Sequence, residues 1–201
     1  MPGWEGASVR LEGRLVVVEP LGPEHEGDLW EAAQDAEVWR WMPSHAAADR
    51  ETFHAWLEDA LARRDAGLDV PFAVVERASG KAIGSTRYLA LRPEHSGIEI
   101  GWTWNARSAW GSGANAEAKL LLLRHAFETL GCIRVEFKTD ALNERSRAAL
   151  EALPARFEGI FRKHMLVREG AVRDSAYYAI TDDEWPAVRA NLERRLETKS
   201  S

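Results

Sequence analysis

The residues most able to carry out chemistry lie in one stretch, residues 98–130, which reads IEIGWTWNARSAWGSGANAEAKLLLLRHAFETL. Glu99 is a carboxylate in its first segment, where alternating apolar residues predict a β-strand. Gly111 and Gly113 follow in a turn, and glycine there accepts positive φ and lets another group approach the backbone closely. The stretch therefore joins a group that can accept a proton to a turn that can contact a ligand.

An amphipathic helix is expected directly behind this turn. Its first amide groups would have no partner inside the helix, and together with the helix dipole they suit a phosphate. A tight strand-to-helix connection is the alternative interpretation of two glycines at this spacing. In the strand, the period of two predicts one face made of Ile98, Ile100, Trp102 and Trp104 and an opposite face made of Glu99, Gly101 and Thr103.

The turn and the helix match a longer pattern. Trp110, Gly111, Gly113, Glu117 and Ala118 are in register with W-G-x-G-x-A-x-E-A. This run resembles the acyl-CoA binding motif of the GNAT superfamily of N-acyltransferases, and the closest type is similar to RimJ/RimL. In that family Gly or Ala is usual at the place of Asn115, and Gln or Arg is common at the place of Trp110.

The resemblance implies acetyl-CoA as the cosubstrate. The backbone after Glu99 would hydrogen-bond the pantetheine arm, and the turn would hold the pyrophosphate. By resemblance the cofactor-binding residues are Trp102, Thr103, Trp104, Trp110, Gly111, Ser112, Gly113, Ala114, Asn115 and Asn143.

Residues 143–159, NERSRAALEALPARFEG, resemble a second family stretch. By this resemblance Asn143 hydrogen-bonds the pantetheine and Ser146 donates a proton to the departing thiolate, while a helix N-cap is the alternative role for Asn143. Leu150 stands where many members carry a tyrosine acid, so that acid is absent. Pro154 stands where a glycine normally ends the helix, so the chain is expected to leave the helix extended after Leu153.

Glu99 is the candidate general base. A primary amine has a pKa near 10, so at neutral pH only about one molecule in a thousand is nucleophilic, and a carboxylate that accepts the proton directly or through water raises that fraction. The alternative is an ordinary solvent-facing glutamate of a strand. For the acceptor, the resemblance points to a wall formed by Trp39, Trp41 and Trp56, with core packing as the alternative for Trp56.

These residues must be positioned by strands and helices that alternate along the chain. Strand patterns occur at residues 9–20, 71–77, 81–91, 98–104, 133–140, 156–167 and 173–181. Short turns imply an antiparallel meander, and the helix after residue 113 implies a parallel neighbour for residues 98–104. We expect an α/β (α+β) protein with the GNAT fold, whose mixed, mostly antiparallel twisted sheet has about seven strands flanked by helices. It forms one domain, residues 1–201, with a core at about 9–185 and a last helix at about 182–197.

Composition narrows the functional class. The chain has 201 residues, 45% hydrophobic and 29% charged, a formal net charge of -6 and no Lys/Arg stripe, so nucleic acid is not an expected partner. An apolar signal segment or spanning run is absent, which predicts a cytoplasmic protein without membrane contact. The single cysteine, Cys132, is expected to be buried and inert, and the six histidines lack metal-ligand spacing, so no metal is predicted.

The sequence therefore predicts an N-acetyltransferase that moves the acetyl group of acetyl-CoA to a primary amine by direct attack. The acceptor is a protein N-terminus or a small amine, and the sequence leaves both open. A catalytically weak acyl-CoA sensor is the alternative. Nine tryptophans make self-association plausible. The resemblance implies the same, since many members of the family form dimers, so a homodimer is predicted.

Overall fold

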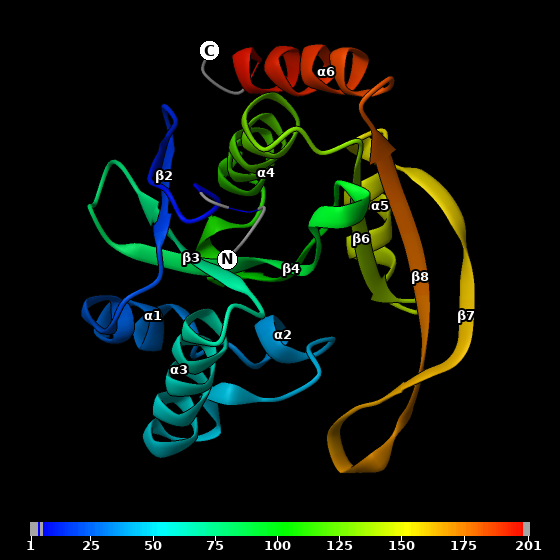
Figure 1. The fold of residues 1–201 in the computed structure, drawn as a ribbon. Helices are drawn as coiled ribbons and strands as arrows, with labels where there is room; N and C mark the ends of the chain where they lie inside the picture. Colours follow the sequence, from blue (N-terminus) through cyan, green and yellow to red (C-terminus); the bar gives the residue numbers. More distant parts are fainter. Residues whose placement is uncertain (1–3, 5, 199–201) are drawn as a thin grey trace.

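An eight-stranded sheet in the order β1-β2-β3-β4-β5-β6-β8-β7 organises the protein, in a computed structural model that describes residues 4 and 6–198 (Figure 1). The strands are β1 (Leu11–Glu12), β2 (Val16–Pro20), β3 (Val70–Glu76), β4 (Ala82–Arg92), β5 (Gly97–Asn105), β6 (Arg134–Asp140), β7 (Arg156–Leu166) and β8 (Val172–Thr181). The α-helices are α1 (Glu26–Ala32), α2 (Ala36–Trp39), α3 (Arg50–Asp65), α4 (Ala114–Arg124), α5 (Glu144–Ala152) and α6 (Trp185–Glu197). A π-helical turn, η5 (His125–Thr129), extends α4.

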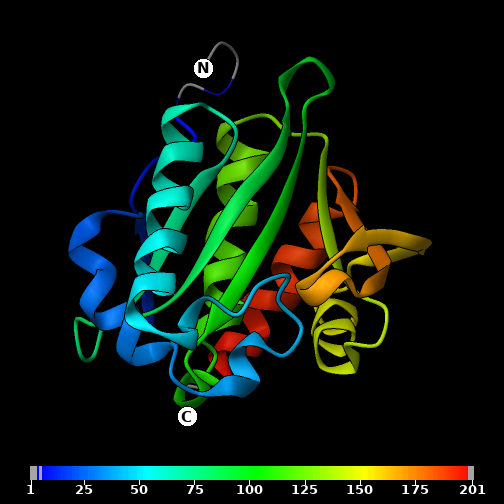
Figure 2. The same ribbon diagram turned by 90° about the horizontal axis from the view of Figure 1, so that it is seen from below.

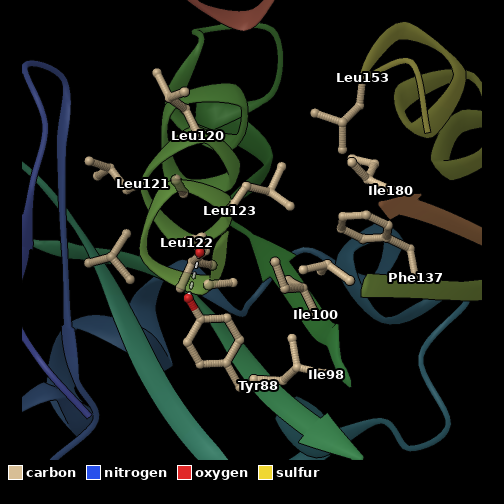
Figure 3. Close-up of a cluster of buried hydrophobic side chains, with 14 of the residues drawn as sticks. Tyr88, Ile98, Ile100, Leu120, Leu121, Leu122, Leu123, Phe137, Leu153 and Ile180 are labelled. Carbon is tan, nitrogen blue, oxygen red and sulfur yellow. Dashed lines mark hydrogen bonds between the residues drawn. The ribbon is translucent and has the colours of Figure 1, made fainter. Parts of the chain in front are cut away.

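Two hydrophobic cores lie on opposite faces of this sheet. Helices α4 and α6 cover one face, and α1, α2 and α3 cover the other (Figures 1 and 2). On the first face, four consecutive leucines of α4 belong to one buried cluster with Ile98 and Ile100, and the Tyr88 hydroxyl donates to the Leu122 carbonyl at 2.6 Å (Figure 3). Since α4 is buried on several sides, it holds the turn before it in a fixed position.

The first strand of the expected sheet divides into two. Residues 9–20 form the hairpin β1–β2, so the sheet has eight strands rather than about seven. Glu117 of α4 binds the turn of this hairpin, because its carboxylate accepts from the backbone amides of Arg14, Leu15 and Val16 at 2.6–3.0 Å. A side chain at Gly13 would collide with that carboxylate. The Glu117 of the sequence motif is therefore a structural clamp.

A β-bulge in β5 changes the expected faces of the strand. Trp102 has φ +50°, and the pairing with β4 shifts between Ser85 and Arg87. The extra residue moves the later side chains to the opposite face. Ile98 and Ile100 belong to the α4 core, whereas Trp104 packs in the core under α3, so the prediction of one shared face was wrong.

β5 and β6 pair over only three residues. The parallel ladder joins Gly97–Glu99 to Arg134–Glu136, as the strand-helix-strand pattern predicts, and ends there. β6 continues to pair with β8 as far as Asp140, and β5 continues to pair with β4 as far as Asn105. The two strands therefore separate beyond Glu99, and within the described chain the backbone of β5 from Gly101 onward has no partner strand on its β6 side.

Helix α5 ends differently from the expectation. Its last residue is Ala152, Leu153 is its C-cap, and Pro154 has φ +28° instead of an extended conformation. The Ala155 amide donates to the Leu150 carbonyl at 3.0 Å, which is the long hydrogen bond of a Schellman cap. The cap is therefore kept, but proline supplies no N–H for its second hydrogen bond and holds a φ that its ring disfavours.

The residues described by the structure include no helix that is both long and apolar enough to span a membrane.

Candidate active site

A cleft of about 470 Å³ opens where β5 and β6 separate. Residues 99–105 of β5 form one side and residues 137–139 of β6 the other. The turn before α4, the first half of α5 and residues 41–43 complete the lining. The interruption of the sheet therefore places backbone groups, the glycine turn and several charged side chains around one space.

The glycine turn has the conformation that the sequence predicts. Gly111 and Gly113 have φ of +79° and +101°, and both line the cleft together with Asn115. Ser112 supports the turn, since its hydroxyl donates to the Ala109 carbonyl at 2.8 Å and accepts from the Ala114 amide at 3.2 Å. Ser112 and Ala114 are therefore parts of the turn rather than of the cleft lining.

Two arginines flank Trp110 beside this turn. The guanidinium carbons of Arg145 and Arg107 lie 3.2 and 4.1 Å from the centre of the indole ring, and the indole N–H donates to the Asn105 carbonyl at 3.0 Å. Burial lowers the pKa of Arg145, and the charge of Arg107 adds to this effect. Two cations held this close to a glycine turn favour an anionic ligand.

Glu99 is buried in the cleft, with only 4% of its surface exposed. Its carboxylate lies 3.5 Å from the Lys138 ammonium. Burial raises the pKa of Glu99, and the charge of Lys138 opposes that rise. The alternative of an ordinary solvent-facing glutamate is excluded, because the side chain faces the cleft rather than bulk water.

Lys119 of α4 is a charged residue of the cleft that the sequence analysis missed. Its ammonium donates to the Thr103 hydroxyl at 3.0 Å and lies 5.4 Å from the centre of the Phe137 ring. Burial lowers its pKa to about 7. It precedes four consecutive leucines in the predicted amphipathic helix, and only its helical spacing from the turn could have indicated that it faces the gap between β5 and β6.

Asn143 and Ser146 meet at the start of α5, and both line the cleft. The Asn143 side chain accepts from the Ser146 amide at 3.1 Å, so Asn143 is the N-cap of the helix, which was its alternative role. Leu150, at the place of the family tyrosine, also lines the cleft. Nothing in its side chain can donate a proton.

The three tryptophans proposed for the acceptor wall separate into two groups. Trp41 lines the cleft with Met42 and Pro43. Trp39 and Trp56 are buried to 0% and 8% exposure and contact Trp104 with ring centres 5.2 and 5.7 Å apart. Trp39 and Trp56 therefore form the core beneath the cleft and are not part of its wall, because their rings fill the space between α3 and the sheet.

Trp102, Thr103 and Trp104 all line the cleft. The Arg87 guanidinium lies 4.9 Å from the Trp102 ring, and the Thr103 hydroxyl hydrogen-bonds that of Thr86 at 2.8 Å. These contacts hold the bulge in place. They therefore also fix the direction of the β5 backbone groups that, in the part of the chain that the structure describes, have no partner strand on the β6 side.

Cys132 is buried and its pKa is raised to about 12 by burial, so it remains a thiol at neutral pH. The His125 ring hydrogen-bonds the Gly6 carbonyl and stacks on Tyr88. Within residues 4 and 6–198, no group of three His, Cys, Asp or Glu side chains could hold a metal ion.

Comparisons with known proteins agree with this architecture. The family model described as the acetyltransferase (GNAT) domain matches residues 14–156. A candidate acetyltransferase from T. thermophilus is 42% identical, with 94% of this chain and 97% of that chain covered and a TM-score of 0.85. A GCN5-related N-acetyltransferase from Brucella melitensis is 34% identical, with 93% and 85% covered and a TM-score of 0.87.

A structure of RimJ from Mycobacterium smegmatis in complex with CoA-disulfide shares the fold, with 23% identity, 96% of each chain covered and a TM-score of 0.79. A comparison with curated proteins gives no match. The family model covers well over half of the chain, and the chain therefore belongs to the GNAT acetyltransferase family.

Proposed function

We propose that this protein transfers the acetyl group of acetyl-CoA to a primary amine by direct nucleophilic attack. The observation that carries the proposal is that the buried carboxylate of Glu99 and the glycine turn before α4 line the same cleft. The turn suits the binding of an anion, and the carboxylate suits the removal of a proton. One cleft can therefore bind the phosphates of the cosubstrate and deprotonate the amine.

The residues of the cleft fit acetyl-CoA. The amides at the start of α4 and the Arg107–Trp110–Arg145 stack would hold the phosphates. Within the described chain the backbone of β5 from Gly101 to Trp104 has no partner strand on the β6 side, so its hydrogen-bonding groups are available to the amides of a pantetheine arm. The same backbone amides would stabilise the negative charge that develops on the thioester oxygen.

Glu99 would accept the proton of the attacking ammonium, directly or through a water molecule. The amine nitrogen then forms a bond to the acetyl carbon while the bond between carbon and sulfur breaks, and the departing thiolate takes a proton. Ser146 faces the cleft and is the proposed donor. Because Leu150 cannot act as an acid, the thiolate depends on this hydroxyl or on water, and loss of Ser146 should have a smaller effect than loss of Glu99.

The test is release of free coenzyme A thiol in the presence of acetyl-CoA and a panel of primary amines. The panel contains peptides with free N-termini, amino acids, polyamines and aminoglycosides. Release above the uncatalysed rate with any of them supports the proposal, and intact mass of the product locates the acetyl group. Calorimetric binding of acetyl-CoA without release would instead support the sensor function.

A further inference from the structure

Arg173 of β8 is a buried cation whose hydrogen-bonding capacity is only partly used. Its residue is 6% exposed, and it lines the same cleft as Glu99. Its ion-pair partner is the carboxylate of Asp140, 3.9 Å from the Arg173 Nε, which is too far for a hydrogen bond. The Nε atom is itself buried and has no hydrogen-bond partner in the described chain.

The other cations of the cleft have closer partners. Lys138 lies 3.5 Å from the Glu99 carboxylate, and Lys119 donates to Thr103 at 3.0 Å. Arg145 stacks on Trp110, and Arg195 donates to the Ala152 carbonyl. Burial lowers the pKa of Arg173, while the charges of Asp140 and Glu99 oppose that change. A guanidinium remains charged under these conditions, and a buried charge with an unsatisfied Nε–H donor is costly unless an acceptor completes that hydrogen bond.

The charges of this part of the cleft form a complementary pattern. Glu99 offers a negative group and Arg173 a positive one, and the two lie close enough to influence each other electrostatically. A primary amine that also carries a carboxylate matches both, with its nitrogen at Glu99 and its carboxylate at the fork of Arg173. Leu89 and Met165 also line the cleft and give it apolar surface for the rest of such a molecule.

We propose that Arg173 selects the acceptor, and that the acceptor is a small primary amine bearing a carboxylate, as in an amino acid. This inference rests on the proposed acetyl transfer and adds the class of the substrate. Arg173 is the specificity-determining residue, because it contacts the carboxylate and takes no part in proton transfer.

The experiment compares acceptors that carry a carboxylate with amides of the same carbon skeleton, which lack it. Coenzyme A release is measured with glycine and glycinamide and with 4-aminobutyrate and 4-aminobutanamide, and kcat/KM is calculated for the unprotonated amine. For the wild-type protein we expect kcat/KM to be at least about tenfold higher for the acid of one pair than for its amide. Tenfold corresponds to about 1.4 kcal/mol, close to the lower limit of what a hydrogen bond to a charged group contributes.

The Arg173→Gln variant should bring that ratio close to one, mainly through a higher KM for the acid, while activity with the amide and the affinity for acetyl-CoA remain. Arg173→Lys keeps the charge without the planar fork and should give an intermediate ratio. Arg162→Gln, a change of an exposed arginine on the neighbouring strand β7, is the matched control and should leave the ratio unchanged. Thermal melting of each variant verifies that it folds.

If Arg173→Gln does not fold, the ratio measured for the wild-type protein and for Arg173→Lys decides the question. Equal or higher activity with the amides, or an equal loss for acid and amide in Arg173→Gln, overturns the inference and leaves acetyl transfer intact. A peptide acetylated faster than every amino acid overturns the small-molecule class. Coenzyme A release with none of the amines, neutral ones included, overturns the proposed function and this inference together.

Discussion

At the scale of single residues, the ion pair between Glu99 and Lys138 sets the conditions for proton transfer. Burial raises the pKa of Glu99, and a raised pKa makes the carboxylate a stronger base than an exposed glutamate. Glu99→Gln should therefore lower kcat about a hundredfold while the dissociation constant of acetyl-CoA stays the same. Glu94→Gln, at an exposed glutamate on the loop before β5, is the control.

The pH profile tests the same assignment. Since a general base acts only when deprotonated, the proposed role of Glu99 requires kcat/KM of the wild-type protein to fall as pH falls through its raised pKa. Glu99→Gln should lose that limb of the profile. Wild-type turnover of the variant at neutral pH would assign the base to another group or to water.

Gly113 tests the binding turn. Its φ of +101° is disfavoured for any side chain, and a β-branched residue would also obstruct approach to the first amides of α4. Gly113→Val should raise the dissociation constant of acetyl-CoA at least about tenfold, or about 1.4 kcal/mol, by calorimetry. Gly80→Val imposes a similar backbone penalty at φ +70° in a distant turn and should leave the affinity unchanged. If both variants bind acetyl-CoA with the same affinity, the turn is not part of the binding site.

Lys119 links the cleft to stability. Its folded-state pKa of about 7 is below the ordinary lysine value of 10.5, so between these two pH values the unfolded chain binds more protons than the folded protein. The free energy of unfolding of the wild-type protein should therefore increase between pH 7 and 9 by about 2 kcal/mol more than that of Lys119→Met. Urea denaturation at pH 7, 8 and 9 measures this difference, with Lys163→Met at an exposed lysine as control. If the free energy of unfolding depends on pH in the same way for the wild-type protein and for Lys119→Met, Lys119 does not have a lowered pKa in the folded protein.

Sequence patterns predict the residues that belong to a local motif and miss those that meet through space. Glu99, Gly111 and Gly113 were found because each lies in a strand or turn with a recognisable pattern. Arg107 and Arg145 come from segments almost forty residues apart, and both lie against the ring of Trp110. Arg173 and Lys119 enter the cleft from β8 and α4, and nothing in their immediate neighbours distinguishes them from surface charges.

At the scale of elements, one inserted residue decides the geometry of the site. The bulge at Trp102 turns the rest of β5, which buries Trp104 under α3 and brings Thr103 to the side of Lys119. Strict alternation fails to anticipate this, because a bulge leaves the residue types of a strand unchanged and adds only one position. The strand, the turn and the helix were predicted correctly. The faces to which the side chains after Gly101 point were not.

Helix α5 carries the testable prediction at this scale. Pro154 occupies the position of a Schellman cap that normally holds glycine, with φ of +28°. Pro154→Gly would remove the strain of the ring and restore an N–H to the cap, which outweighs the added freedom of the unfolded chain, about 1 kcal/mol. We expect a rise in melting temperature of a few kelvin and faster turnover, since α5 also carries Ser146. A lower melting temperature without a gain in rate would mean that the proline suits its backbone.

At the scale of the whole molecule, the sequence predicts the order of strands better than their number. The antiparallel run from β2 to β5, the crossover through α4 and the parallel neighbour β6 follow from turn lengths and from the handedness of strand-helix-strand units. The β1–β2 hairpin escaped prediction because Gly13 lies in an otherwise continuous strand pattern, and the contact that defines it comes from Glu117, about one hundred residues later.

Self-association is the last prediction, and its basis changes with the structure. Five of the nine tryptophans are buried, so they do not form the expected surface. Exposed apolar side chains instead gather on the edge strand β7, where Phe157, Ile160 and Phe161 are 44–55% exposed. An edge strand presents unpaired backbone groups, and apolar residues on it favour pairing with a second copy.

We therefore expect light scattering to give a dimer at tens of micromolar. The double change Ile160→Lys and Phe161→Lys should produce a monomer with the same fold, because lysine on an edge strand opposes strand pairing and both residues are about half exposed. Leu68→Lys introduces one lysine at an exposed leucine away from β7 and should leave the dimer intact. A wild-type monomer at these concentrations would overturn the prediction, and a dimer that survives the double change would place the interface on another surface.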